Sequence, residues 1–126
     1  MTDLLPAFTA PQLHSPQRET VVLLHSSAAS ARQWDALAER LRPRFEVHAI
    51  DLHGHGRQAP WRGDRPLSVH DEAALALPAI ERAGAVHLVG HSYGAAVALH
   101  LAAARPSRVG SLALYEALPF RLLAEH

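Results

Sequence analysis

A five-residue turn near the middle of the chain most constrains its fold, because it must join a strand directly to a helix. The apolar run Val86–Val89 has the length and β-branched content of a buried strand. It leads into Gly-His-Ser-Tyr-Gly at residues 90–94, and an Ala- and Leu-rich stretch with strong helix preference follows. The two glycines lack β-carbons, so the strand and the helix can approach closely. The spacing predicts that Ser92 is held outward by a cramped bend at the carboxyl edge of a sheet.

Ser92 in that position has the geometry of a nucleophile. The carboxyl edge of a parallel sheet is the side where ligands bind in such folds. The N–H of Tyr93 would lie at the N-terminus of the following helix and point to where negative charge develops during attack. The alternative is an ordinary glycine-rich turn with an incidental serine. Because strand, turn and helix occur in the required order, the sequence favours the nucleophile interpretation.

The other apolar segments alternate between strand-like and helix-like patterns along the chain. Ser30 and Ser68 are expected N-caps of two helices, and Pro78 is expected to kink the second helix or split it in two. This order predicts right-handed crossovers and an α/β fold, a three-layer sandwich with a mostly parallel central sheet of about four core strands. The other strands are expected at residues 21–24, 45–50 and 109–115, and the two helices at 31–41 and 68–83.

The two ends of the chain have patterns of their own. Three prolines within residues 1–19 exclude a long helix and predict an extended lead-in, with a short edge strand at 7–13. Residues 118–126 follow the last predicted strand and are expected to begin a further helix. The chain therefore divides into a lead-in, residues 1–19, and one domain, residues 20–126.

Charge and composition exclude several classes of partner. Twelve basic residues balance twelve acidic ones, so the chain has no electrostatic footprint for nucleic acid or an anionic membrane. No cysteine is present, and no apolar segment approaches the roughly 20 residues that span a bilayer. Residues 1–10 lack the charged start and apolar run of a signal peptide. We therefore expect a cytoplasmic protein that acts on a small molecule rather than on nucleic acid or a membrane.

The best candidate for a metal site is the pair His53 and His55. These residues stand two positions apart, with Asp51 as a weak third ligand. The second pair of ligands that zinc sites normally have is missing. The interpretation as a polar loop is therefore favoured, and we expect neither a metal ion nor a cofactor.

Four motifs, taken in order, resemble the α/β-hydrolase family. They are His-Ser-Ser at 25–27, Asp-x-x-Gly-x-Gly at 51–56, Gly-His-Ser-Tyr-Gly at 90–94, and Leu-Tyr-Glu-Ala-Leu-Pro at 114–119. They cover the chain from about residue 20 to its end, and together they are more specific than any one alone. The resemblance implies that residues 20–126 are a partial α/β-hydrolase domain with a truncated form of that fold. It also implies hydrolysis of an ester-like or similar small substrate.

The resemblance also assigns roles to residues of this chain. It makes Ser92 the nucleophile and makes the N–H groups of Tyr93 and Ser27 the two donors of an oxyanion hole. Ser26 stands where the family turn has glycine. Glu116 closes the last predicted strand, where some members, such as the haloalkane dehalogenases, carry the catalytic acid. The alternative for Glu116 is a hydrogen bond to neighbouring backbone at the edge of the sheet.

A general-base histidine is not identified. In the family it lies beyond a further pair of strands, and a serine hydroxyl is a weak nucleophile without a base. His91 adjoins Ser92, but neighbouring side chains of a strand point to opposite sides. His25 is expected to have a packing role, and His53 and His55 lie on a loop at the correct edge.

Two hypotheses follow from the missing base. The first is a serine hydrolase that is incomplete as an isolated chain. The second is a non-catalytic truncated fragment or association module with the same fold. In both, the strand at 109–115 has an exposed edge, which predicts a homo-oligomer or a complementing chain.

Overall fold

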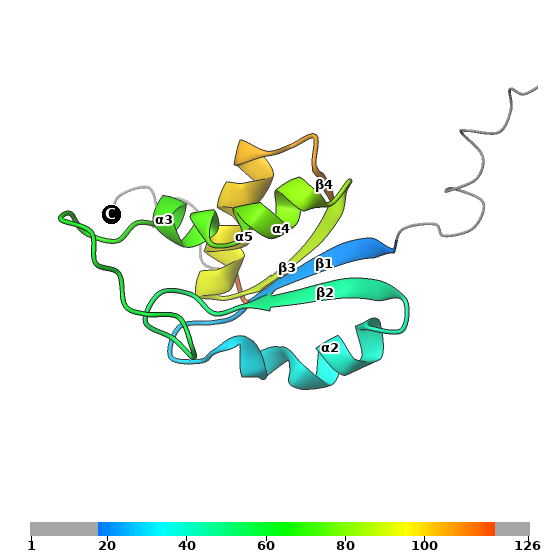
Figure 1. Cartoon of the computed structure of the whole chain (residues 1–126), viewed down its shortest axis with the longest axis horizontal. Helices are drawn as coiled ribbons and strands as arrows, with labels where there is room; N and C mark the ends of the chain where they lie inside the picture. The colour runs from blue at the N-terminus through cyan, green and yellow to red at the C-terminus, as the bar shows by residue number, and fades with distance from the viewer. Residues whose placement is uncertain (1–17, 118–126) are drawn as a thin grey trace, which may run out of the picture.

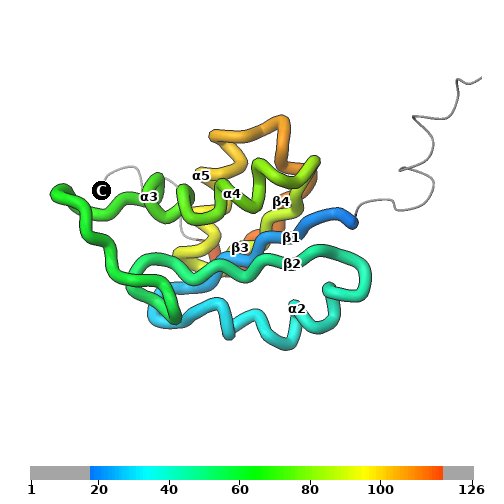
Figure 2. The backbone as a smooth tube through the Cα atoms, viewed as in Figure 1, coloured from blue at the N-terminus to red at the C-terminus, as the bar shows by residue number. Residues whose placement is uncertain are grey.

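The computed structural model describes residues 18–117, which form a four-stranded parallel sheet covered by helices on both faces (Figure 1). Residues 1–17 of the expected lead-in at 1–19, the short strand at 7–13 and the helix at 118–126 lie outside the described residues. The strand order is β2-β1-β3-β4, and Figure 2 shows β1 running between β2 and β3. The strands are β1 (Glu19–Leu24), β2 (Phe45–Ile50), β3 (Val86–His91) and β4 (Val109–Tyr115).

The helices divide between the two faces of the sheet and make the predicted three layers. A short 3-10 helix and α2 cover one face, and α3, α4 and α5 lie on the other (Figure 1). None of the helices within residues 18–117 combines the length and the apolar character needed to cross a membrane. The helices are the 3-10 helix η1 (Ala31–Trp34), α2 (Asp35–Leu41), α3 (Val69–Ala74), α4 (Leu77–Arg82) and α5 (Tyr93–Ala104).

The local sequence signals of the helices are largely confirmed. The Ser30 hydroxyl accepts the N–H of Arg32, so the N-cap is as predicted, although the helix begins as a 3-10 turn. Ser68 caps α3 in a reciprocal capping box with Asp71. The predicted second helix is divided into α3 and α4, with Pro78 in the first turn of α4, where its missing N–H costs nothing.

The core consists of two layers of apolar side chains, one on each face of the sheet. On one face, Val22 and Leu88 pack with side chains of α4 and α5. On the other face, Val21 and Leu23 pack beneath Trp34 and the helix α2. The side chains of β1 from residue 20 onward are therefore buried on both faces, as expected for a central parallel strand. Glu19 belongs to β1 rather than to the predicted lead-in.

The edge of the sheet at β4 is open within residues 18–117. β4 pairs with β3 along one side, and no described strand pairs with its other side. Its side chains are largely exposed, including Leu112 at 37%, Leu114 at 38% and Tyr115 at 62%. The predicted free strand edge is thus present in this part of the chain.

Candidate active site

Ser92 occupies a strained bend between β3 and α5, as the sequence predicts. Its φ is 55° and its ψ is −112°, a conformation that non-glycine residues rarely adopt. A β-carbon on Gly90 would lie 2.5 Å from the carbonyl oxygen of Gly94, and one on Gly94 would lie 2.1 Å from that of Leu24. Both glycines are therefore required by close backbone contacts. The bend is located at the carboxyl edge of the sheet, where α5 begins (Figure 1).

The bend at Ser92 is also held by the neighbouring strand. The N–H of Ser92 donates to the carbonyl oxygen of Tyr115 at 2.9 Å. Tyr93 is the first residue of α5, so its N–H has no acceptor within the helix. Among residues 18–117 this N–H has no hydrogen-bond acceptor, and it lies beside the serine at the positive end of the helix dipole.

The turn after β1 carries the second predicted oxyanion donor, Ser27. The N–H of Ser26 donates to Oε1 of Gln33 at 3.0 Å, and the N–H of Ala28 donates to Nε2 of His55 at 3.3 Å. Among the described residues, the N–H of Ser27 between them has no hydrogen-bond acceptor. The left-handed residue of this turn is Ala28, with φ 61°, and not Ser26, which replaces the family's glycine.

A second loop at this edge, residues 51–57, is hydrogen-bonded to the turn that follows β1. His25 is fully buried; its Nδ1–H donates to the carbonyl oxygen of Ser26 at 2.6 Å, and its Nε2 accepts the N–H of Leu52 at 3.0 Å. Burial lowers the pKa of His25, so the imidazole is neutral and has the packing role that we expect. Burial opposes ionisation of Asp51, but N–H groups of Ala31 at 2.7 Å and of residue 57 at 3.0 Å lower its pKa.

A buried carboxylate that sequence reasoning missed joins this loop to α5. Glu72 is only 1% exposed; its Oε1 accepts the N–H of His53 at 2.9 Å, and its Oε2 accepts the hydroxyl of Tyr93 at 2.9 Å. Burial, together with Glu72, raises the pKa of the Tyr93 hydroxyl. The side chain of Tyr93 is thereby fixed. Nothing in the local pattern around Glu72 distinguishes it from the other acidic residues of a helix.

Glu116 bonds to a histidine side chain rather than to backbone. Its Oε1 lies 2.7 Å from Nε2 of His91, the residue that precedes the predicted nucleophile. The other ring nitrogen of His91 lies 2.6 Å from Nε2 of Gln33. Glu116 itself has a φ of 51°, so the chain turns sharply as it leaves β4. Gln33 is a second residue that sequence reasoning missed, because its partners lie far away along the chain.

Within residues 18–117, no histidine nitrogen makes a hydrogen bond to the hydroxyl of Ser92. A different serine has such a partner: Oγ of Ser111 lies 2.7 Å from Nδ1 of His87, whose Nε2 is paired with Glu19. The two predicted loop histidines have other partners. The ring of His55 is hydrogen-bonded to the backbone of Ala28 and of His53, and the ring of His53 packs against the ring of Trp61. The described residues also contain no group of three potential metal-binding side chains.

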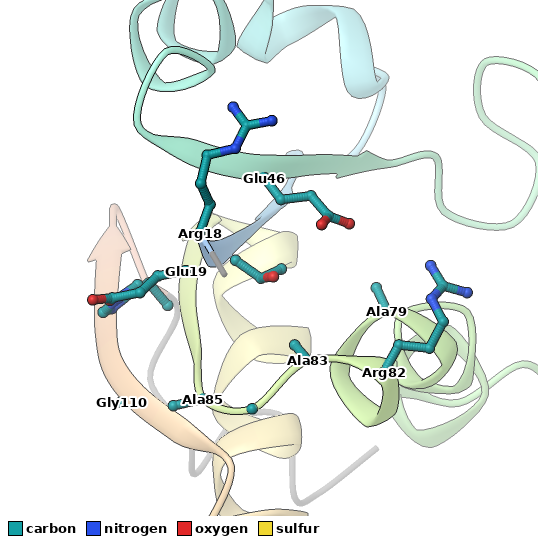
Figure 3. A pocket seen from close by; sticks show the side chains of 11 residues that line it. Arg18, Glu19, Glu46, Ala79, Arg82, Ala83, Ala85 and Gly110 are labelled. Atoms are coloured by element: carbon teal, nitrogen blue, oxygen red, sulfur yellow. The ribbon is translucent and has the colours of Figure 1, made fainter. Parts of the chain in front are cut away.

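A cavity of about 590 Å³ lies at the opposite, amino-terminal edge of the sheet. Glu46 of β2 and Arg82 of α4 reach toward each other across it (Figure 3). Ser92 and Tyr93 do not line it. The cavity is therefore separate from the candidate active site.

The strand order, the parallel sheet and the bend at Ser92 together define a partial α/β-hydrolase fold. A model of the alpha/beta hydrolase family matches residues 21–125. The chain belongs to the alpha/beta hydrolase family.

The relatives include a lipase and methyl ester esterases by name. The chain is similar to Lipase LipV of Mycobacterium tuberculosis, at 42% identity over 76% of this chain and 36% of that protein. It is also similar to a pimeloyl-[acyl-carrier protein] methyl ester esterase of Nitrosomonas europaea, at 34% identity over 79% of this chain and 37% of that protein.

Solved structures of other proteins are similar to this chain in fold. Cfl2 of Burkholderia cenocepacia superposes with a TM-score of 0.71 at 31% identity, covering 82% of this chain and 37% of that chain. A marine microorganism esterase superposes with a TM-score of 0.69 at 28% identity, covering 79% and 38%. The chain thus spans less than half the length of these relatives.

Proposed function

We propose that this chain contributes the nucleophile and the oxyanion hole of a serine hydrolase that cleaves ester-like small substrates. The observation that carries the proposal is the strained bend at Ser92, which sets the hydroxyl beside the free N–H of Tyr93. Strain of this kind costs free energy, and it is typical of residues whose position serves chemistry. The ester class is supported by the names of the lipase and methyl ester esterase relatives.

The proposed reaction is acyl transfer to water through a covalent intermediate. Oγ of Ser92 attacks the ester carbonyl and loses its proton to a general base. The N–H groups of Ser27 and Tyr93 donate hydrogen bonds to the resulting oxyanion. The alkoxide leaves with the proton from the base, and water then hydrolyses the acyl-serine by the reverse sequence. We assign the role of catalytic acid to Glu116, whose carboxylate lies at the same edge of the sheet.

The general base of this proposal comes from outside residues 18–117, because no imidazole in that range is bonded to Ser92. The open edge of β4 offers a place for the chain that carries it, either a further segment or a complementing partner. Leu112, Leu114 and Tyr115 supply exposed apolar surface along that strand. The cytoplasmic location expected from the composition stays a prediction.

A fluorophosphonate probe tests the proposal directly. The expected result is a stoichiometric adduct that peptide mapping locates at Ser92 and that Ser92→Ala abolishes. Ser111→Ala is the matched control, because Ser111 is exposed and its hydroxyl is bonded to an imidazole. An adduct that survives Ser92→Ala and disappears in Ser111→Ala would contradict the assignment of the nucleophile.

The second candidate function is a non-catalytic association module, and the open edge of β4 favours it. In that case the probe leaves Ser92 unmodified under conditions that label a control hydrolase. Sedimentation velocity then shows concentration-dependent association, which a charged substitution such as Leu114→Lys on β4 weakens.

A further inference from the structure

We infer that Gln33 and His91 form a hydrogen-bond relay that positions the oxyanion turn relative to the nucleophile bend. The relay starts at the carboxylate of Glu116, passes through His91 and Gln33, and ends at the backbone of Ser26. The inference rests on the proposed function, because it treats the turn at residues 26–27 as part of an oxyanion hole. It assigns a role to Gln33, which no sequence motif singles out.

The direction of every hydrogen bond in the relay follows from its two ends. An ionised carboxylate only accepts, so Nε2 of His91 donates to Glu116 at 2.7 Å. The N–H of Ser26 only donates, so Oε1 of Gln33 accepts it at 3.0 Å, together with the Ser26 hydroxyl at 3.3 Å. The amide nitrogen of Gln33 then donates to Nδ1 of His91 at 2.6 Å. The neutral Nε2–H tautomer of His91 satisfies all of these bonds at once.

The relay connects the residues that immediately precede the two proposed functional groups. Ser26 precedes Ser27, whose N–H is a proposed oxyanion donor, and His91 precedes Ser92. The relay spans four separate segments, namely the turn after β1, the helix η1, β3 and the end of β4. A shift of η1 relative to the sheet would therefore change the distance between the donor and the nucleophile.

The tautomer of His91 is set by Gln33 and Glu116, which contact its two ring nitrogens. The side chain is 18% exposed, and its ring lies 4.8 Å from that of Tyr115. The titratable groups that face the ring are Glu116 and Tyr115 from the end of β4, while Gln33 faces it from η1. Removal of the Gln33 amide frees Nδ1 of His91 and leaves the N–H of Ser26 without its acceptor.

Two substitutions at Gln33 test the relay. Gln33→Leu keeps the size of the side chain and removes both hydrogen bonds. Gln33→Glu keeps an acceptor for Ser26 but cannot donate, so His91 must gain a proton at Nδ1 to lie between two carboxylates. Gln58→Leu is the control, because within residues 18–117 only the backbone N–H of Gln58, and not its side chain, makes a hydrogen bond.

The first readout is the pair of ¹⁵N imidazole shifts of His91, which does not depend on catalysis. The wild-type protein is expected to show the Nε2–H tautomer, and Gln33→Leu is expected to move the Nδ1 resonance while Gln58→Leu does not. Gln33→Glu is expected to move both ¹⁵N resonances of His91 toward those of an imidazole with a proton on each nitrogen, because only such a ring donates to two carboxylates at once. A wild-type His91 protonated at Nδ1 alone overturns the relay.

The second readout is the rate constant for fluorophosphonate labelling of Ser92. Misplacement of a donor by about 1 Å costs about 100-fold, so Gln33→Leu is expected to label about 10- to 100-fold more slowly than Gln58→Leu. Labelling of Gln33→Leu within twofold of the control overturns the positioning role. If the wild-type protein labels neither alone nor together with the segment or partner that supplies the base, the proposed function fails, and the imidazole shifts still decide whether the relay exists.

Discussion

Gly94 allows the closest backbone approach in the candidate site, and Gly94→Ala tests whether that approach is required. A β-carbon at this position would lie 2.1 Å from the carbonyl oxygen of Leu24 and 2.5 Å from that of His25. Both atoms belong to backbone at the end of the central strand β1, which is buried on both faces and cannot yield as a flexible side chain does. Overpacking of a core typically costs 1–3 kcal/mol, and we expect the upper end, about 3 kcal/mol.

Urea unfolding followed by circular dichroism measures this cost. For a domain of this size, 3 kcal/mol corresponds to a fall in Tm of about 12 °C. Gly84→Ala is the matched control, because no heavy atom lies within 4 Å of a β-carbon there. The control is expected to be neutral or to stabilise by up to about 1 kcal/mol, because alanine restricts the unfolded chain. A Gly94→Ala protein that unfolds within about 1 kcal/mol of the Gly84→Ala protein would refute the close approach of α5 to β1.

Three further substitutions test separate features. Ser92→Gly is expected to stabilise the fold by about 1 kcal/mol in urea unfolding while abolishing the probe adduct, because glycine adopts a positive φ without strain; destabilisation would argue against strain. Ser68→Ala is expected to cost about 1 kcal/mol in the same assay by removing the N-cap of α3, and no change would show that the capping box is energetically silent. Because the folded pKa of His25 lies below its unfolded value of 6.5, the unfolded chain binds the additional proton below that pH. Stability is therefore expected to fall as pH drops from about 6.5 toward the folded pKa, by at most about 1.4 kcal/mol per pH unit, and His25→Gln should reduce that slope; an unchanged slope would contradict burial of a neutral imidazole.

The features that sequence reasoning predicted are those encoded by neighbouring residues. The bend at Ser92 depends on two glycines that lie within the same five residues. The division of the helix at Pro78 and the cap at Ser68 depend equally on local chemistry. Local steric rules operate in the same way wherever the segment lies, so these predictions are confirmed without knowledge of the rest of the fold.

The features that sequence reasoning missed depend on partners distant in the chain. The helix at residues 31–41 starts as a 3-10 turn, and the N–H of Ala31 is taken by the carboxylate of Asp51, 20 residues away. The strand predicted to end at Val89 continues to His91, because residues 90 and 91 pair with Leu114 and Tyr115 of β4.

The side-chain network of the site was missed for the same reason. Gln33 and His91 are 58 residues apart, and Glu72 and Tyr93 are 21 apart. Only the register of the sheet brings such pairs together, and a single sequence does not state that register.

The hydrogen bond from the N–H of Ser92 to the carbonyl oxygen of Tyr115 has a consequence for assembly. The last described strand, β4, is hydrogen-bonded directly to the backbone of Ser92. A change in the position of Tyr115 would change the support of the strained bend at Ser92. A segment or partner that pairs with the open edge of β4 would therefore act on the same strand that supports this bend.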